Sequence, residues 1–333
     1  MAPSAKQLMV DGDSCVEEKE GPQADLDAEL APLTGHGSSP SADIESWSGG
    51  IGTENVSPAL RKASHAIALR AAAEGVSLLV ASNDYPGPAL PATDPDVTAV
   101  GGTTLGIGAQ GQRLFETGWS DGLVERTGNG GPWQYRDIYL ASGGGASHLY
   151  REPSYQKAVV PSSMATNHAG HPGRTVPDIS ADADLMTGIL FGQFQPKSNR
   201  KTTPYTTFVG GGTSLSTPLV AGIVLDAEQG QPRNFGFLNP LLYSLAGSPA
   251  FHDILPLSSS DPQVDRAAFA NPATLYHRRH KPVVSLFDDQ DPRHTHQVTA
   301  TGYDTMTGLG TPSGAAFIDG LRSAARPRRR AGN

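Results

Sequence analysis

A continuous apolar stretch at residues 76–82 (V-S-L-L-V-A-S) constrains the fold of this chain more than any other feature. Such stretches are typical of parallel strands whose two faces are both covered. An amphipathic helix is predicted just before it, at residues 58–74, and short strands are predicted at residues 43–47 and 97–100. Strand, helix and strand in this order predict an α/β fold, a doubly wound and mostly parallel sheet with helices on both faces.

Other elements are predicted from shorter patterns: a strand at residues 6–10, helices at 24–33 and 313–324, and a connector at 173–183 leading to strands near 188–190. Residues 101–145 are rich in glycine and polar side chains and are predicted to be a long surface excursion. Residues 256–298 have no clear period and are interpreted as an insertion with one hairpin strand at 283–287. The arginine-rich residues 326–333 are predicted to form a disordered tail.

Composition excludes several classes of protein. A length of 333 residues suggests about two domains, and the net charge of −8 argues against a general nucleic-acid binder. Cys15 is the only cysteine, so the chain can form neither an internal disulfide nor a thiolate metal cluster. No apolar stretch approaches the roughly 18–20 residues needed to cross a bilayer, and the first seven residues lack the apolar region of a secretory signal.

The segment Gly210-Gly211-Gly212-Thr213-Ser214 is followed by an apolar run that predicts a buried helix, starting near Ser214 and ending at Gly230. Pro218 is expected in its first turn, where few backbone hydrogen bonds are lost. A serine at a helix N-terminus lies beside free N–H groups and the positive end of the helix dipole, as a nucleophile that stabilises an oxyanion requires. On this segment alone, an ordinary N-cap serine is an equally good interpretation. The pattern G-T-S-x-x-x-P resembles the nucleophile segment of the subtilisin and sedolisin families.

Three further stretches favour the second family. Residues 80–104 contain A-S-N-D and then L-P-A-T-D-P-D-V-T-A-V-G-G-T, similar to the sedolisin pattern A-S-G-D followed by F-P-A-x-x-P-x-V-T-A-V-G-G-T. Residues 173–184 look like the segment G-R-x-V-P-D-x-S-A-D-A-D, and residues 251–254 with 302–310 resemble the C-terminal calcium site of the family. From Asp43 to Leu321 the chain resembles the sedolisins, which are serine-carboxyl peptidases with a subtilisin-like fold.

The subtilisin alternative lacks support in the residues. That family needs a histidine base in H-G-T-H and an early aspartate in D-T-G. The nearest approach in this chain is His36-Gly37-Ser38, in a polar stretch.

The resemblance implies roles for two residues. Ser214 would be the nucleophile, and Asp84 would be the acid that donates a hydrogen bond to the oxyanion, which requires a protonated carboxyl. The alternative is that Asp84 only stabilises a turn. Asn83 stands where the family usually has glycine, and asparagine tolerates a positive φ better than most residues.

The resemblance also implies one calcium ion. Asp253 and Asp304 would supply carboxylates, and Ile254, Ala300 and Gly302 would supply carbonyl oxygens, an all-oxygen set that suits a hard cation. Ala300 occupies a position where glycine is usual, but only its carbonyl is needed. The alternative is a pair of surface aspartates in turns.

The general base of the family has no clear match. Sedolisins carry a Glu with an Asp four residues later, which puts both carboxylates on one helix face. One alignment takes Leu26-Asp27 as the end of this motif and puts Gln23 at the base position, where a carboxylate is missing. The other matches residues 1–6 to the segment that follows the catalytic helix. It fits better because it needs no deletion before residues 42–47.

On this second alignment, residues 1–325 are expected to be a sedolisin-type peptidase domain whose N-terminal part is missing. The leading hypothesis is a serine-type endopeptidase that hydrolyses peptide or protein substrates at acidic pH through an acyl-enzyme. The rival is a catalytically inactive, calcium-stabilised fold that binds peptides or partners. An esterase would need a G-x-S-x-G elbow, which residues 212–216 lack. A monomer without nucleic-acid or membrane partners is expected, and the family implies an extracellular location.

Overall fold

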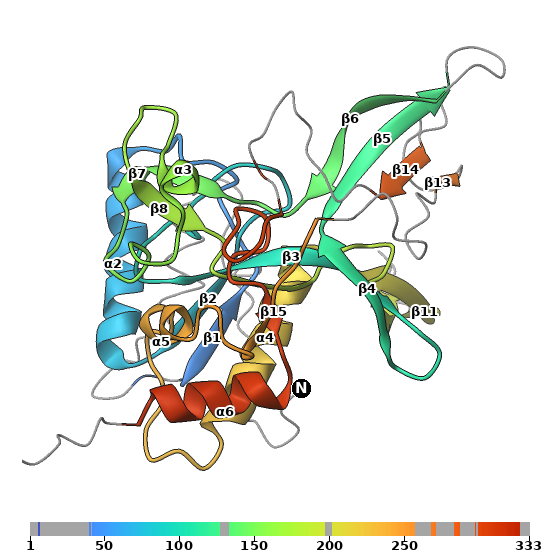
Figure 1. The fold of residues 1–333 in the computed structure, drawn as a ribbon. Helices are drawn as coiled ribbons and strands as arrows, with labels where there is room; N and C mark the ends of the chain where they lie inside the picture. Colours follow the sequence, from blue (N-terminus) through green and yellow to red (C-terminus); the bar gives the residue numbers. More distant parts are fainter. Residues whose placement is uncertain are drawn as a thin grey trace, which may run out of the picture.

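A five-stranded sheet, in which four strands are parallel, forms the centre of the protein (Figure 1). The computed structural model describes residues 6, 40, 42–126, 133–196, 202–256, 268–270, 283–286, 297 and 299–326. The parallel strands lie in the order β1 (Ile44–Trp47), β2 (Ser77–Ala81), β3 (Thr98–Ile107) and β9 (Ile179–Asp182). All residues of β2 are buried, as the apolar stretch predicts. The predicted α/β fold with a mostly parallel sheet is confirmed.

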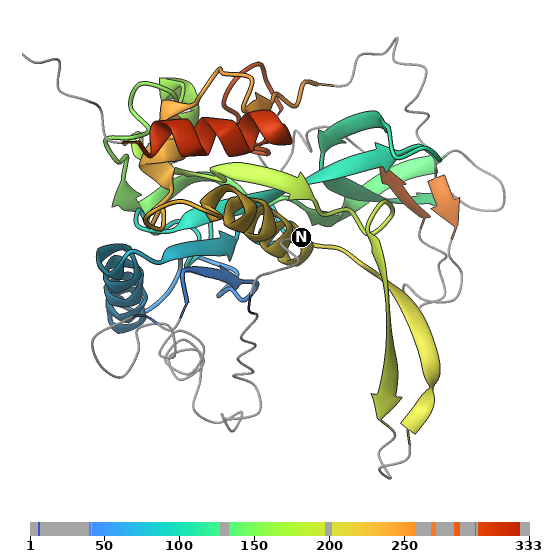
Figure 2. The same cartoon turned by 90° about the horizontal axis from the view of Figure 1, so that it is seen from below.

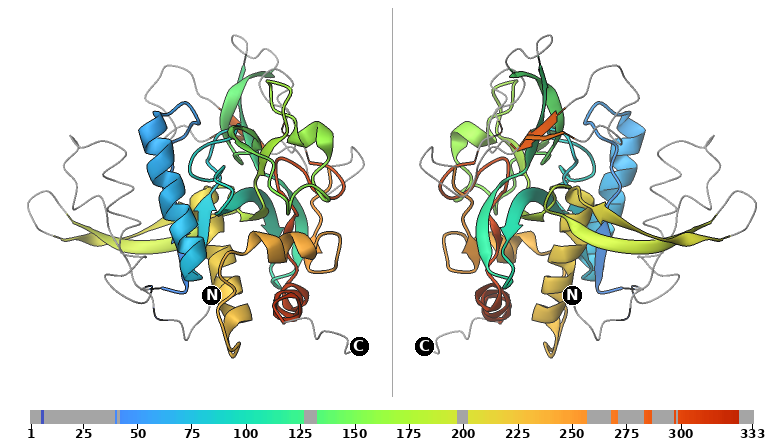
Figure 3. Two further views of the ribbon diagram at one scale, coloured as in Figure 1. Left: turned by 90° about the vertical axis from the view of Figure 1, so that its left-hand side faces the viewer. Right: turned by 90° about the vertical axis from the view of Figure 1, so that its right-hand side faces the viewer.

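Helices cover both faces of this sheet. On one face Leu79, Val100 and Ile179 pack in one cluster with α4 (Thr213–Glu228) and α6 (Ala315–Ala324). On the other face the alternate side chains of β2 and β3 pack with α2 (Pro58–Glu74). Figure 3 shows α2 and α6 on opposite sides of the molecule. The period-two alternation of strand side chains therefore divides the core into two layers.

Local signals set the ends of α2 where the sequence predicts them. The hydroxyl of Ser57 accepts a hydrogen bond from Leu60 N, and Pro58 begins the helix. Gly75 closes it with a φ of 79°, and its N–H donates to the carbonyls of Ala71 and Ala72.

The prediction of a surface excursion at residues 101–145 is wrong. β3 extends to Ile107, and the stretch then forms three antiparallel strands: β4 (Arg113–Gly118), β5 (Ser120–Arg126) and β6 (Trp133–Ala141). Trp119, between β4 and β5, is fully buried. The glycines at 101 and 102 serve close packing, since a Cβ at Gly102 would lie 2.5 Å from the Cβ of Ala183.

The remaining elements extend from this core. β13 (Ala268–Ala270) and β14 (Val283–Leu286) join β5 and β6 in a second sheet, so the strand predicted at 283–287 is confirmed. The other strands form two-stranded pairs: β7 (Gly145–Arg151) with β8 (Gly173–Val176), β10 (Ile189–Pro196) with β11 (Thr202–Gly210), and β12 (Phe251–His252) with β15 (Thr311–Pro312). Two short helices are α3 (Ser162–Ala165) and α5 (Asn239–Ser244).

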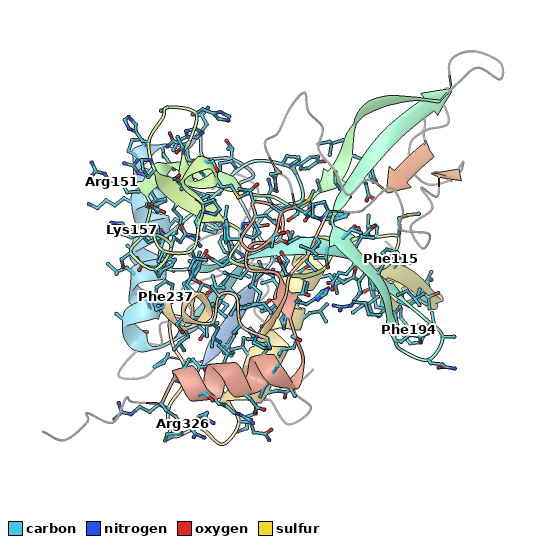
Figure 4. All side chains as sticks on the ribbon, in the orientation of Figure 1. Phe115, Arg151, Lys157, Phe194, Phe237 and Arg326 are labelled. Carbon is cyan, nitrogen blue, oxygen red and sulfur yellow. The ribbon has the colours of Figure 1, made fainter. Side chains whose placement is uncertain are left out.

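The β10–β11 hairpin projects from the body as a long ribbon (Figure 2). Its apolar side chains are exposed, including Leu190 and Phe194 (Figure 4). β11 ends at Gly210, directly before the predicted nucleophile segment.

The predicted helix at residues 24–33 lies outside the described residues, as does the strand at 6–10 apart from Lys6 and the tail after Arg326. The helix predicted at 313–324 is confirmed as α6. Among the described helices, none is long and apolar enough to span a membrane.

Candidate active site

Three glycines lead into α4, and the last of them shapes the candidate site. Gly212 has a φ of 86°, which disfavours any residue with a Cβ, and α4 begins at the next residue, Thr213. Ser214 therefore lies in the first turn of α4, as predicted, and its side chain is exposed. The site opens to solvent at a helix N-terminus.

Pro218 lies inside α4 and not in its first turn, which corrects the sequence prediction. Proline has no N–H, so the carbonyl of Ser214, four residues earlier, loses its helical donor. The hydroxyl of Ser48 donates to this carbonyl at 3.0 Å instead. A residue just beyond β1 thus replaces the missing hydrogen bond and ties the sheet to the predicted nucleophile.

The carboxyl ends of three strands of the parallel sheet converge on the start of α4. Ser48 follows β1, Asp84 follows β2 and Ala183 follows β9. The carbonyl of Ala183 accepts a hydrogen bond from Gly212 N at 2.5 Å. Functional sites of doubly wound sheets form at this edge, because the loops after parallel strands meet there.

Asp84 makes direct contact with the N-terminus of α4. Its Oδ1 accepts hydrogen bonds from Thr213 N at 2.7 Å and from Thr213 Oγ1 at 2.8 Å. Its Oδ2 lies against Gly212, where an added Cβ would be only 2.6 Å away. Oδ1 is occupied by two donors, which leaves Oδ2 as the oxygen that can carry a proton and donate a hydrogen bond.

The backbone holds Asp84 in this position. Asn83 has a φ of 100° and is the one non-glycine residue with a positive φ among those described. This matches the expectation that asparagine can replace the usual glycine here. The carbonyls of Asn83 and Asp84 accept hydrogen bonds from Gly143 N and Ala141 N. The turn after β2 is therefore fixed on the strand that ends at Ala141.

Ser214 has no general base in the described part of the chain. Its Oγ donates to the carbonyl of Ser48 at 3.4 Å, and no Asp, Glu or His in that part accepts its proton. Gln23 and Asp27, considered for the base motif, lie outside the described residues.

Known proteins with similar sequences were compared with this chain. No family model matches it. Kumamolisin from Bacillus sp. (strain MN-32) is 31% identical over 297 residues, which cover 86% of this chain and 43% of kumamolisin. Sedolisin from Pseudomonas sp. (strain 101) is 35% identical over 170 residues, 49% of this chain and 24% of that protein. Tripeptidyl-peptidase 1 from Homo sapiens is 27% identical over 279 residues, 76% of this chain and 38% of that protein.

A solved structure has a similar fold. The solved structure of Pseudomonas sedolisin, a serine-carboxyl proteinase, superposes with a TM-score of 0.63 at 23% identity, covering 92% of this chain and 71% of that chain. The chain belongs to the sedolisin family. It spans less than half the length of each of the three curated relatives named above.

Next to the nucleophile segment, this sedolisin chain buries a pair of carboxyl groups that was not predicted as a site from the sequence. Asp121 is 1% exposed and Asp184 is fully buried. Burial and, to a lesser extent, the charge of Asp184 raise the pKa of Asp121 to about 8, and burial also raises the pKa of Asp184. A pair of this kind holds a proton at neutral pH.

Few donors reach the pair. Trp119 Nε1 donates to Asp121 Oδ2 at 3.1 Å, whereas Asp121 Oδ1 is buried without a hydrogen-bond partner among the described residues. Asp184 accepts from Thr104 Oγ1 and Met186 N. Asp184 directly follows Ala183, whose carbonyl anchors Gly212, so the pair supports the loop that carries Ser214. The pair forms only where β5 packs against the segment after β9, and no local sequence pattern predicts that contact.

The predicted calcium residues come together where the end of β12 meets residues 300–304. Gly302 N donates to Asp253 Oδ2 at 2.9 Å, and Ala300 N donates to Asp304 Oδ2 at 3.2 Å. Ile254 and Asp304 are fully buried. Burial raises the pKa of Asp304 to about 7, against the effect of hydrogen bonds from Thr307 and Met306. The alternative of two surface aspartates in turns therefore does not hold for Asp304.

This donor set fits a cation in one specific respect. Asp253 Oδ1 is buried and has no hydrogen-bond partner in the part of the chain that the structure describes, which is costly for a carboxylate oxygen unless a positive charge lies beside it. Asp304 Oδ1 is already saturated by Met306 N and Thr307 N. Asp253 therefore has the greater capacity to ligate an ion.

Proposed function

We propose that this chain carries the nucleophile and the oxyanion acid of a serine-type endopeptidase that cleaves peptide bonds at acidic pH. The observation that carries the proposal is the contact of the Asp84 carboxyl with Thr213, the residue before Ser214, at the open N-terminus of α4. Membership of a family of serine-carboxyl peptidases supports the same reaction class.

The chemistry follows from the two side chains. Ser214 Oγ would attack the carbonyl carbon of the scissile peptide bond and pass its proton to a general base. Negative charge would develop on the substrate oxygen, and a proton on Asp84 Oδ2 would be donated towards it. The general base would return this proton to the leaving amine, and water would then hydrolyse the ester on Ser214.

Acidic conditions suit this mechanism for two reasons. A carboxylic acid can donate a hydrogen bond only while it is protonated. The buried carboxyl pair beside the nucleophile loop also binds a proton more readily in the folded chain, because burial raises the pKa of both Asp121 and Asp184.

A second candidate function is peptide binding without turnover. It is favoured by one observation, the hydrogen bond from Ser214 Oγ to a backbone carbonyl in place of a base. Loss of a general base typically lowers the rate by two to four orders of magnitude.

Two measurements separate these candidates. Turnover of a fluorogenic peptide library between pH 3 and pH 7, abolished in the Ser214→Ala variant, would establish the peptidase. A peptide aldehyde tests the nucleophile without the base, because it needs only a serine oxygen and a site for the oxyanion. Aldehyde binding that depends on Ser214, without turnover, would favour the binding function. Turnover that survives Ser214→Ala would overturn the assignment of the nucleophile.

We propose further that one calcium ion binds at Asp253 and Asp304, with carbonyl oxygens of Ile254, Ala300 and Gly302. The buried, unpartnered Asp253 Oδ1 supports this. Chelation is expected to lower the melting temperature of the wild-type chain and to leave that of Asp253→Asn unchanged. Equal melting of the wild-type chain with calcium and with chelator would contradict the site.

A further inference from the structure

A second group of potential metal ligands meets between α2 and the loop that precedes β3. His65 comes from α2, and Asp94 and Asp96 come from the loop. His65 Nδ1 lies 2.9 Å from Asp94 Oδ2 and 3.8 Å from Asp96 Oδ2. One ligand atom from each of the three side chains lies within 4.8 Å of the others.

Backbone geometry orients the central ligand of this group. Asp94 Oδ1 accepts a hydrogen bond from Asp96 N at 3.0 Å, which fixes the carboxylate and directs Oδ2 towards His65. Hydrogen bonds of this kind set the orientation of metal ligands in proteins. The Asp94 side chain is fully buried, whereas the side chains of His65 and Asp96 are 39% and 24% exposed. The group therefore has a rigid buried ligand and an opening to solvent through which an ion can enter.

The charges of the group favour the binding of a cation. Asp94 and Asp96 bring two carboxyl groups to one place, beside the imidazole of His65. A proton on His65 is one source of positive charge, and a divalent ion is another.

We propose that His65, Asp94 and Asp96 bind a divalent transition-metal ion of the zinc type, which connects α2 to the loop before β3. One imidazole nitrogen and two carboxylate oxygens are ligands that zinc accepts, whereas calcium takes oxygen ligands alone. Zinc ligands lie about 2.0–2.2 Å from the ion, so in tetrahedral geometry they are about 3.3–3.6 Å apart from one another. The separations of 2.9 Å and 3.8 Å bracket this range, so small side-chain rotations would bring all three ligands to the ion.

The test is a calorimetric titration of the full chain with zinc chloride at pH 7, in buffer saturated with calcium so that the Asp253 site does not contribute. The wild-type chain is expected to bind zinc, and its melting temperature is expected to rise with zinc concentration. His65→Ala and Asp96→Asn are each expected to weaken binding about tenfold or more, since loss of even an indirect ligand contact commonly costs that much.

The matched control is His171→Ala, which removes an exposed histidine outside the group and should bind zinc as the wild-type chain does. Circular dichroism of each variant verifies folding, and Asp96→Asn provides a conservative change at a partly exposed position if His65→Ala fails to fold. Zinc binding that is unchanged in both variants, or absent from the wild-type chain, would overturn the proposal.

Discussion

Asp84 and the pair Asp121–Asp184 are acids next to the same glycine loop, but they differ in burial and in the number of hydrogen-bond donors. Asp84 is half-buried, and backbone and hydroxyl donors of the α4 N-terminus hold one of its oxygens. Asp121 and Asp184 are buried with fewer donors, and one oxygen of Asp121 has none. A carboxyl group held by donors at an open helix end can act on a ligand. A buried pair makes the stability of the loop depend on a proton.

The largest expected effect is on activity, and it distinguishes Asp84 from the buried pair. We expect Asp84→Asn to lower the peptidase rate about 10²–10³-fold, as for loss of one oxyanion donor. An asparagine oxygen can still accept from Thr213, so the free energy of unfolding should change little. Fluorogenic turnover measures the effect; where the chain turns over no substrate, affinity for a peptide aldehyde replaces it. An unchanged rate and affinity would remove Asp84 from the proposed chemistry.

The buried pair should instead control how stability depends on pH. Its pKa values are raised in the folded chain, so the folded state binds more protons than the unfolded state between about pH 4 and pH 8. Stability is therefore expected to fall as pH rises through this window, by an amount on the order of a few kcal/mol. Asp121→Asn should make this fall smaller, as measured by urea unfolding at several pH values. A wild-type stability that rises from pH 4 to pH 8 would contradict this explanation.

The glycine that lies against Asp84 can be tested by a matched pair of variants. In Gly212→Ala the alanine would have to adopt a φ of 86°, and its Cβ would lie 2.6 Å from an Asp84 oxygen. Gly230 has a similar φ of 76° but open space around it, so Gly230→Ala should cost only the backbone strain, about 1–2 kcal/mol. We expect Gly212→Ala to cost more than this and to impair peptide or aldehyde binding. Equal costs, measured by thermal unfolding, would mean that Asp84 moves aside freely.

The smallest effect concerns the connection between β1 and α4. Ser48→Ala removes the hydrogen bond that replaces the donor missing at Pro218, at a cost of about 1 kcal/mol. Restoring a helical donor with Pro218→Ala should recover part of this loss in the double variant. Strictly additive effects in this double-mutant cycle would show that the two features are not coupled.

Several features could be predicted from the sequence because they depend on near neighbours in the chain. The start and end of α2 follow from Ser57, Pro58 and Gly75, and the buried strand β2 follows from an unbroken apolar stretch. The start of α4 near Ser214 follows from the glycines before it. The resemblance puts Asn83 where glycine is usual, and asparagine tolerates the positive φ that the structure shows there.

Other features depended on which strand edges meet, and only the tertiary structure decided them. The stretch 101–145 was predicted to be a surface excursion, but β3 also pairs with β9 and β5 with β14, and no local period reveals partners so far away in sequence. Pro218 is tolerated inside α4 because Ser48, 166 positions away, supplies the missing donor. The pair Asp121–Asp184 and the group around His65 exist only where separate elements pack together. Local periodicity determines helices and strands, whereas the environment of a side chain is set by burial and by contacts between residues far apart in sequence.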